Sequence, residues 1–217
     1  RKTKEAEILF LSYHDQLTGL YNRRFYEEEL KRLDIQRNLP IALVMADVNG
    51  LKMTNDAFGH VAGDELLKAI ARIIKGACRF DDIVARIGGD EFMLLLPKTD
   101  YNAAGNIVRR IKRATGACKV GNTVPSVSFG WSVKTSEQEC ISRIYMQAED
   151  HMYRNKLSES SSMKSETIRL ITKTIFEKNG REEAHAKRVS QLCAQLALDL
   201  GLSAEEGAEL KTAGLMH

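Results

Sequence analysis

The sequence predicts an α+β domain with a mixed, mostly antiparallel central sheet flanked by helices, followed by an all-α C-terminal segment. Three observations support this fold class. Strand-like and helix-like hydrophobic patterns alternate up to about residue 157. The glycine pair Gly88 and Gly89 separates two short apolar runs, which is typical of an antiparallel hairpin. After the serine-rich stretch 158–165, only helical periodicity remains.

Each element of the sheet domain follows from its own pattern. Apolar runs between turn residues predict strands, and apolar positions three or four residues apart predict helices. The run IALVMA, between Pro40 and Asp47, is continuous and is typical of a buried central strand. The predicted strands are Ile41–Ala46, Ile83–Ile87, Glu91–Leu96 and Val124–Val133, and the predicted helices are Arg23–Leu33, Gly63–Ala77, Tyr101–Thr115 and Ile141–Lys156.

The two ends of the chain are predicted to be helical. Residues 1–11 are charged and fit a connecting helix from an upstream sensor, and residues 12–158 form the sheet domain. Residues 159–165 fit a serine-rich linker. Beyond it, Ile168, Ile171 and Ile175 share one helical face, and Ser203 with Glu206 fits a capping box. Residues 166–217 are therefore expected to be the first helices of a second domain.

The composition narrows the possible partners and surroundings. A formal net charge of +3 is too small to indicate nucleic acid or a membrane surface as a partner. The four cysteines have no C-x-x-C spacing and fit reduced thiols. No apolar run has membrane-spanning length, so we expect a cytoplasmic segment whose parent protein could carry an anchor elsewhere.

Three acidic residues, at two places in the sequence, are candidates for metal chemistry. Asp90 and Glu91 follow the glycine pair, whose backbone reaches positive φ easily and leaves room for a bulky ligand. A carboxylate pair beside bare backbone suits Mg²⁺ and a nucleoside triphosphate. Asp47 ends the buried strand, where ligands collect in open sheets. The alternatives are a plain acidic hairpin and, for Asp47, a turn former or N-cap.

Four ordered blocks resemble the GGDEF domain of diguanylate cyclases, which condense two GTP into cyclic di-GMP. The resemblance spans about residues 12–157 and implies an architecture similar to nucleotidyl cyclases and polymerase palms. Four blocks in order are a far more specific signal than one five-letter match. The blocks are DQLTGLYNRR at 15–24, the polar segment Asp47 to Asp64, GGDEF at 88–92 and AEDHMYRNK at 148–156. The polar and glycine-rich segment after Asp47 is predicted to be a loop up to the amphipathic helix.

The resemblance implies a metal and phosphate set. Asp47, the carbonyl of Val48 and Asp90 would ligate Mg²⁺ or Mn²⁺, with two ions per GTP. Asp90 would also assist deprotonation of the attacking 3′-hydroxyl, although activation by the metal alone would be sufficient. Lys52, also implied in catalysis, and Lys156 would contact phosphates. A lone lysine is otherwise a solvated surface residue.

The resemblance also implies how guanine is read. Asn55 and Asp64 match the base-reading positions, because a carboxylate accepts from the guanine N1 and N2 hydrogens and an amide meets the remaining edge. His60 lies close to them in the sequence and would touch the nucleotide, with loop packing as an equal alternative. Glu91 is a weaker candidate, because neighbouring strand residues point to opposite faces.

The pair Arg79 and Asp82 resembles the inhibitory R-x-x-D site of the family, where product binds away from the GTP loop. The alternative is a capped turn with an exposed ion pair. The chain departs from the family pattern in two places. Asn49 and Leu51 replace an aspartate and an aromatic residue, and the stretch after Lys156 lacks a phosphate-binding arginine, which implies weaker triphosphate affinity.

The C-terminal helices resemble the start of an HD-type phosphodiesterase domain, often of the HD-GYP kind. The resemblance is carried by HAKRV at 185–189 and LMH at 215–217. In that family an aspartate follows the last histidine and both bind metal. Here the sequence stops at His217, so the metal set is incomplete.

The functional prediction is a diguanylate cyclase that releases two pyrophosphates per cyclic di-GMP and is inhibited by its product. Because each domain would hold one GTP, a homodimer would be needed for catalysis. No nucleic acid and no direct membrane contact is expected for this segment. The alternative is a catalytically idle module that binds GTP or cyclic di-GMP and regulates an adjacent HD domain. The missing arginine after Lys156 motivates that alternative.

Overall fold

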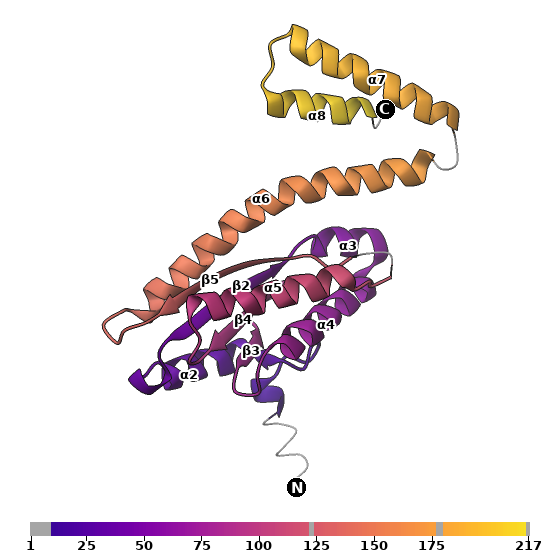
Figure 1. Ribbon diagram of the computed structural model, residues 1–217. Coiled ribbons are helices and arrows are strands. Elements are labelled where there is room, and N and C mark those ends of the chain that lie inside the picture. The colour runs from indigo at the N-terminus through magenta and orange to yellow at the C-terminus, as the bar shows by residue number, and fades with distance from the viewer. Residues whose placement is uncertain (1–9, 122–123, 177–179, 216–217) are drawn as a thin grey trace. The chain divides into compact units, whose positions relative to one another are not determined.

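The computed structural model describes residues 10–121, 124–176 and 180–215 (Figure 1). The chain divides into two compact units, Arg1–Ser158 and Glu159–His217. The connecting helix predicted for residues 1–11 lies outside the described residues except at Phe10 and Leu11, which are helical.

The first unit contains a five-stranded sheet in the order β1-β3-β4-β2-β5. All neighbouring strands are antiparallel except the pair β1 and β3, which confirms the mixed, mostly antiparallel sheet. The two-residue strand β1 was not predicted, because it is too short to show a hydrophobic period. The strands are β1 (Tyr21–Asn22), β2 (Ile41–Val48), β3 (Ile83–Arg86), β4 (Glu91–Leu96) and β5 (Val127–Lys134).

Helices cover both faces of this sheet (Figure 1). The helices α4 (His60–Ala77) and α5 (Tyr101–Ala117) lie on one face, and α2 (Arg23–Leu33) and the start of α6 (Ile141–Phe176) lie on the other. Strand side chains alternate between the two faces. All eight residues of β2 are buried, which explains its uninterrupted apolar sequence.

The segment after β2 differs from its prediction. The polar and glycine-rich stretch read as a loop forms the helix α3 (Leu51–Phe58), and α4 begins at His60, three residues before the predicted start at Gly63. Gly50 and Gly59 have φ values of 72° and 83°, so each glycine turns the chain where a helix begins. The sequence looks like a loop because Thr54 alone is buried in α3, which leaves no apolar stripe.

Two other boundaries also differ. The strand predicted from Val124 begins at Val127, and Pro125, which has no backbone N–H to donate, lies just before this start. The backbone N–H of Asn49 donates to the carbonyl of Ser126 at 2.9 Å, and its side chain donates to the Ser126 hydroxyl at 3.1 Å. The serine-rich linker predicted at 159–165 is part of the continuous helix α6. Residues 159–165 contain no glycine or proline, and serines alone do not end a helix.

The second unit contains a helical hairpin of α7 (Gly180–Asp199) and α8 (Ala204–Leu215). The capping box predicted before α8 is present, because the Ser203 N–H donates to Glu206 Oε2 at 2.9 Å and the Glu206 N–H to Ser203 Oγ at 3.3 Å. Gly214 packs so closely that a Cβ there would lie 2.7 Å from Cys193 Sγ. Within the described ranges, no helix is both long and apolar enough to cross a bilayer.

Candidate nucleotide and metal site

The three predicted metal ligands meet at one end of β2. Asp47 lies opposite Glu91 in the β2–β4 register, so it lies beside the tip of the signature hairpin. The Val48 N–H donates to the carbonyl of Asp90 at 2.9 Å. The antiparallel register therefore joins the strand-end aspartate to the first acid of GGDEF, although they are far apart in the sequence.

The side chain of Asp47 is in an unfavourable state for a carboxylate. The residue is only 6% exposed, and burial raises the pKa of Asp47. The Lys156 ammonium counteracts this rise, and the nearby charge of Asp90 adds to it. Lys156 Nζ forms an ion pair with Asp47 Oδ1 at 2.7 Å, and no well-aligned hydrogen bond from the described residues reaches that oxygen.

These observations fit a divalent cation. A buried, under-compensated carboxylate close to a second acid is stabilised by a hard cation. Within the described part of the chain, no cluster of three or more histidine, cysteine, aspartate or glutamate residues could hold a metal by itself. Two carboxylates and one carbonyl would leave half of the octahedral shell of Mg²⁺ to phosphate and water.

The two signature glycines do not behave as predicted. Positive φ values occur at other glycines of the described backbone, and neither Gly88 nor Gly89 has one. A Cβ at Gly88 would lie 3.0 Å from Glu91 Oε2, whereas a Cβ at Gly89 would meet nothing within 4 Å. Intramolecular packing therefore does not require a glycine at position 89, and the open backbone there is left for a ligand.

Two arginines that the sequence analysis missed hold this hairpin. Arg86 Nη2 donates to the carbonyl of Gly89 at 2.8 Å, and Arg86 Nη1 donates to Asp15 Oδ1 at 3.1 Å. Arg23 Nε donates to the carbonyl of Ile87 at 3.2 Å. The motif at 15–24 thus supports the turn that carries Asp90. The available signal was that Arg86 precedes the signature and that Asp15 opens its own block.

The carboxylate of Asp15 accepts hydrogen bonds from Thr18 as well as from Arg86. The Thr18 N–H donates to Asp15 Oδ1 at 2.9 Å, and the Thr18 hydroxyl donates to it at 2.6 Å. Burial alone would raise the pKa of Asp15, but these bonds and the Arg86 guanidinium outweigh it and hold the pKa below its usual value. Asp15 therefore stays ionised as the counter-charge for Arg86.

The predicted guanine-reading residues lie where α3 meets α4. Asn55 packs so tightly on the first turn of α4 that a Cβ at Gly63 would lie 1.9 Å from Asn55 Oδ1. Asp64, the next residue along α4, is exposed. His60 is the first residue of α4 and is also exposed, and Lys52 is exposed in the first turn of α3. The polar face formed by these two helix ends is open to solvent.

The R-x-x-D pair is partly used by its own turn. Asp82 is 3% exposed, and its Oδ2 accepts from the backbone N–H of Arg79 at 2.6 Å. Burial raises the pKa of Asp82. Both residues also line a cavity of about 500 Å³ together with Phe25, Arg32 and Lys98. The structure shows the capped-turn geometry and also a cavity beside it.

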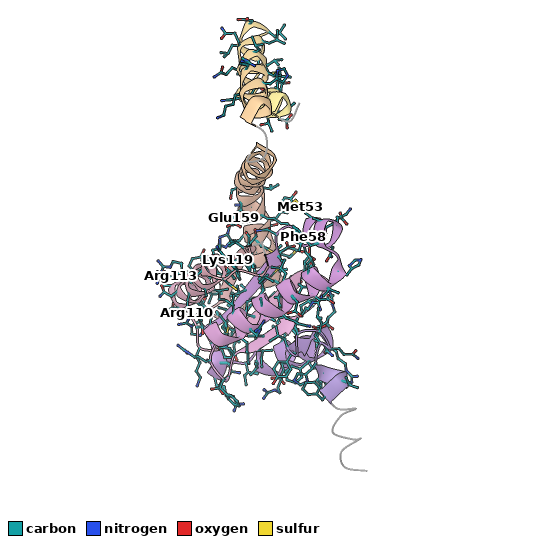
Figure 2. All side chains as sticks on the ribbon, turned by 90° about the vertical axis from the view of Figure 1, so that its right-hand side faces the viewer. Met53, Phe58, Arg110, Arg113, Lys119 and Glu159 are labelled. Atoms are coloured by element: carbon teal, nitrogen blue, oxygen red, sulfur yellow. The ribbon has the colours of Figure 1, made fainter. Side chains whose placement is uncertain are left out.

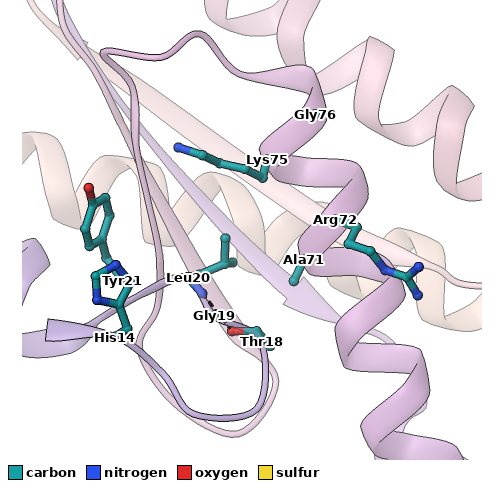
Figure 3. A pocket seen from close by; sticks show the side chains of 9 residues that line it. All are labelled: His14, Thr18, Gly19, Leu20, Tyr21, Ala71, Arg72, Lys75 and Gly76. Atoms are coloured by element: carbon teal, nitrogen blue, oxygen red, sulfur yellow. Dashed lines mark hydrogen bonds between the residues drawn. The ribbon is translucent and has the colours of Figure 1, made fainter. Parts of the chain in front are cut away.

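Another cavity, of about 400 Å³, lies between the segment 14–21 and α4 (Figure 3). Lys75 extends toward Tyr21 in this cavity, while Arg72 points away from it (Figure 3). None of the predicted site residues lines it. The cavity is therefore separate from the candidate nucleotide site.

The comparisons with known proteins agree with this geometry. Residues 12–162 match the family described as "Diguanylate cyclase, GGDEF domain". The chain is 32% identical over 162 residues to the diguanylate cyclase DgcM of Escherichia coli, covering 72% of this chain and 39% of the relative. It is 33% identical over 156 residues to DgcS of Shewanella oneidensis, covering 70% and 52%. The chain thus spans about half or less of these relatives.

Solved structures share the fold. The diguanylate cyclase SiaD of Pseudomonas aeruginosa, solved with its activator SiaC, has a TM-score of 0.63 and 30% identity, with coverage of 72% of this chain and 64% of that chain. The GGDEF domain of PA1120 from the same species has a TM-score of 0.61 and 32% identity, with coverage of 67% and 90%. With the profile match over residues 12–162, these similarities show that the chain belongs to the GGDEF diguanylate cyclase family.

Proposed function

We propose that the first unit is a diguanylate cyclase that condenses two GTP into cyclic di-GMP and two pyrophosphates. The observation that carries the proposal is the meeting of Asp47, Val48 and Asp90 at one end of β2. The buried carboxylate of Asp47 has an oxygen without a hydrogen bond and a second acid close by. Lys156 can compensate only one of the two acidic charges, so the arrangement favours a further cation, above all when Lys156 pairs with a phosphate.

The protein groups would act on GTP in distinct ways. Asp47, the Val48 carbonyl and Asp90 would hold two ions per GTP, either Mg²⁺ or Mn²⁺, which neutralise the triphosphate and the departing pyrophosphate when bound. Lys156 would exchange its pairing with Asp47 for a phosphate oxygen. Lys52 would approach the triphosphate from α3. Asp90 would accept the proton of the attacking 3′-hydroxyl.

Guanine selection would depend on the contact between α3 and α4. The exposed carboxylate of Asp64 would accept from the N1 and N2 hydrogens, and Asn55 would meet the remaining edge. His60, exposed beside them, would contact the nucleotide. Adenine would leave these polar groups without partners, which makes such a site selective.

Two copies would have to face each other, because one domain is proposed to hold only one of the two GTP molecules. Exposed apolar side chains lie on the same helices as the nucleotide residues. Met53 and Phe58 on α3 are 50% and 60% exposed (Figure 2), and Val61 on α4 is 78% exposed. Apolar side chains gathered beside a polar site are typical of a surface covered by a partner. They support a homodimer across this face.

Product feedback would use the cavity beside Arg79. The Arg79 side chain can grip a phosphate and stack on guanine. Asp82 already uses Oδ2 for its turn, so Arg79 would provide most of the binding. The space of about 500 Å³ beside them supports this part of the proposal.

The α7–α8 hairpin would be the start of an HD-type domain, with His185 exposed on α7. His217 lies outside the described residues. A cytoplasmic location would follow from the use of GTP.

The proposal is tested with purified protein and labelled GTP in the presence of Mg²⁺ or Mn²⁺. Wild-type protein should release pyrophosphate and form cyclic di-GMP. Asp90→Asn keeps the side-chain shape, and turnover should fall by more than about 100-fold while circular dichroism stays unchanged. Asp150→Asn, an exposed change on α6, is the matched control. Binding of GTP without pyrophosphate release would contradict the proposal and favour the idle binding module.

A further inference from the structure

The outer edge of the sheet is bonded to α6 by side chains. In the described sheet, β5 is an edge strand that pairs with β2, so its other edge has backbone groups available. Asn155 Nδ2 donates to the carbonyl of Phe129 at 2.7 Å. His151 Nδ1 lies 3.2 Å from both the nitrogen and the oxygen of Trp131.

A third contact continues this row. The Ser132 hydroxyl donates to Gln147 Oε1 at 2.8 Å. Gln147, His151 and Asn155 are spaced four residues apart, so they form one stripe along α6. We call these three residues the polar ladder.

The backbone of α6 lies directly on β5 beside the ladder. A Cβ at Gly130 would lie 2.0 Å from the nitrogen of Met152 and 2.2 Å from the carbonyl oxygen of Ala148. Contact this close restricts rotation and translation of the helix. The ladder then selects one register of α6 along the strand.

That register determines where Lys156 lies. Phe129, which Asn155 holds, is the register partner of Ala46 in β2. Asp47 is the next residue of β2, and Lys156 is the next residue of α6. The bond from Asn155 to Phe129 therefore fixes the backbone of Lys156 relative to the strand that carries Asp47, where Lys156 Nζ lies 2.7 Å from Asp47 Oδ1.

We propose that Gln147, His151 and Asn155 are positioning residues that place Lys156 for contact with the GTP triphosphate. The proposal rests on the proposed function, because it needs GTP to bind at Asp47. No arginine follows Lys156 in residues 157–162. Binding of the triphosphate from this part of α6 would therefore depend on where Lys156 lies. Asn155 should have the largest effect of the three, because it precedes Lys156 directly and donates to the backbone of β5.

The first test uses Asn155→Ala. Alanine has a higher helix propensity than asparagine, so α6 stays helical and only the bond to Phe129 is lost. KM for GTP should rise about tenfold with kcat changed less than about twofold, because a phosphate contact is made in both the ground and transition states. Asp150→Ala, an exposed change with a similar propensity gain, should match the wild type.

A double-variant cycle separates positioning from simple packing. In a Lys156→Ala background, Asn155→Ala should raise KM no further, because the lysine that it positions is gone. If the two effects multiply, or if Asn155→Ala has a wild-type KM, the ladder only packs the helix and the proposal fails.

A further readout does not need turnover. Trp131 is the single tryptophan, and its ring centroid lies 4.6 Å from that of His151. Asn155→Ala should shift Trp131 emission and speed hydrogen exchange of its amide, whereas Asp150→Ala should not. If wild-type protein binds GTP without turnover, the proposed function fails but the ladder is still tested by the dissociation constant in the same cycle. Absence of any GTP binding would overturn both.

Discussion

Asp47 and Asp82 are both buried aspartates whose pKa is raised by burial, yet their surroundings differ. Asp82 accepts a hydrogen bond of 2.6 Å from the Arg79 backbone within its own turn. Asp47 Oδ1 accepts none from the described residues and lies close to a second acid. Burial alone therefore does not mark a functional carboxylate. A buried carboxylate beside a like charge, whose partner is the partly exposed ammonium of Lys156 and not a backbone group of its own turn, is the better indicator.

The largest expected effect comes from Asp47→Asn. The amide keeps the shape but cannot replace the charged ligand, so turnover should fall by more than about 100-fold. Thermal stability should not decrease, because the change removes a poorly compensated buried charge. Melting curves with Mg²⁺ and GTP check this, since ligand should raise Tm in the wild type and not in the variant. A variant with lower Tm and retained turnover would make Asp47 a structural residue.

Asp82→Ala should reduce stability and leave turnover nearly unchanged, which is the opposite of the result expected for Asp47→Asn. Loss of the carboxylate removes the acceptor of the Arg79 N–H, and the free energy of unfolding should fall by about 1 kcal/mol. Turnover measured before product accumulates should change little. Urea denaturation measures the loss, and Asp81→Ala, at the exposed neighbouring position, is the control. Equal stability of the two variants would show that the cap contributes nothing.

Arg79→Ala separates the cap from the proposed regulation. The hydrogen bond to Asp82 comes from the Arg79 backbone, so the side chain can be removed and the cap kept. Stability should stay within about 0.5 kcal/mol of the wild type. Cyclic di-GMP should inhibit the wild type noncompetitively with GTP and inhibit the variant weakly. Unchanged inhibition, or simple competition with GTP, would remove Arg79 from the product site.

The smallest effect concerns a third aspartate, Asp15, whose pKa is lowered rather than raised. A lowered pKa in the folded state stabilises the protein above the unfolded value of about 3.8, and this contribution is lost as pH falls through the folded-state value. The stability difference between wild type and Asp15→Asn should therefore be largest at neutral pH and shrink in acid. A difference that grows with acidity would reverse the assigned direction.

The sequence predicted best the features that repeat locally. The unbroken apolar run of β2 identified a strand buried on both faces, and the glycine pair identified the hairpin. The candidate metal set came from the family resemblance. How close these ligands lie to one another depends on the register between β2 and β4, which the sequence motifs only imply.

Features that depend on distant backbone groups were not predictable. Arg86 and Arg23 bind carbonyl oxygens of the hairpin, and Asn155 binds the carbonyl of Phe129. A carbonyl has no side-chain identity, so such a bond leaves no pattern in the sequence. The helix α3 was missed for another reason, since it begins at a left-handed glycine and buries a single threonine.

The position of β2 in the sheet also affects how the chain is made. Both neighbours of β2, β4 and β5, come later in the sequence, and the lysine that pairs with Asp47 follows them. During synthesis from the N-terminus, this apolar strand therefore emerges with two unpaired edges. Strands in that state are prone to aggregate. We expect the growing chain to need protection, such as that of a chaperone, until β5 has left the ribosome.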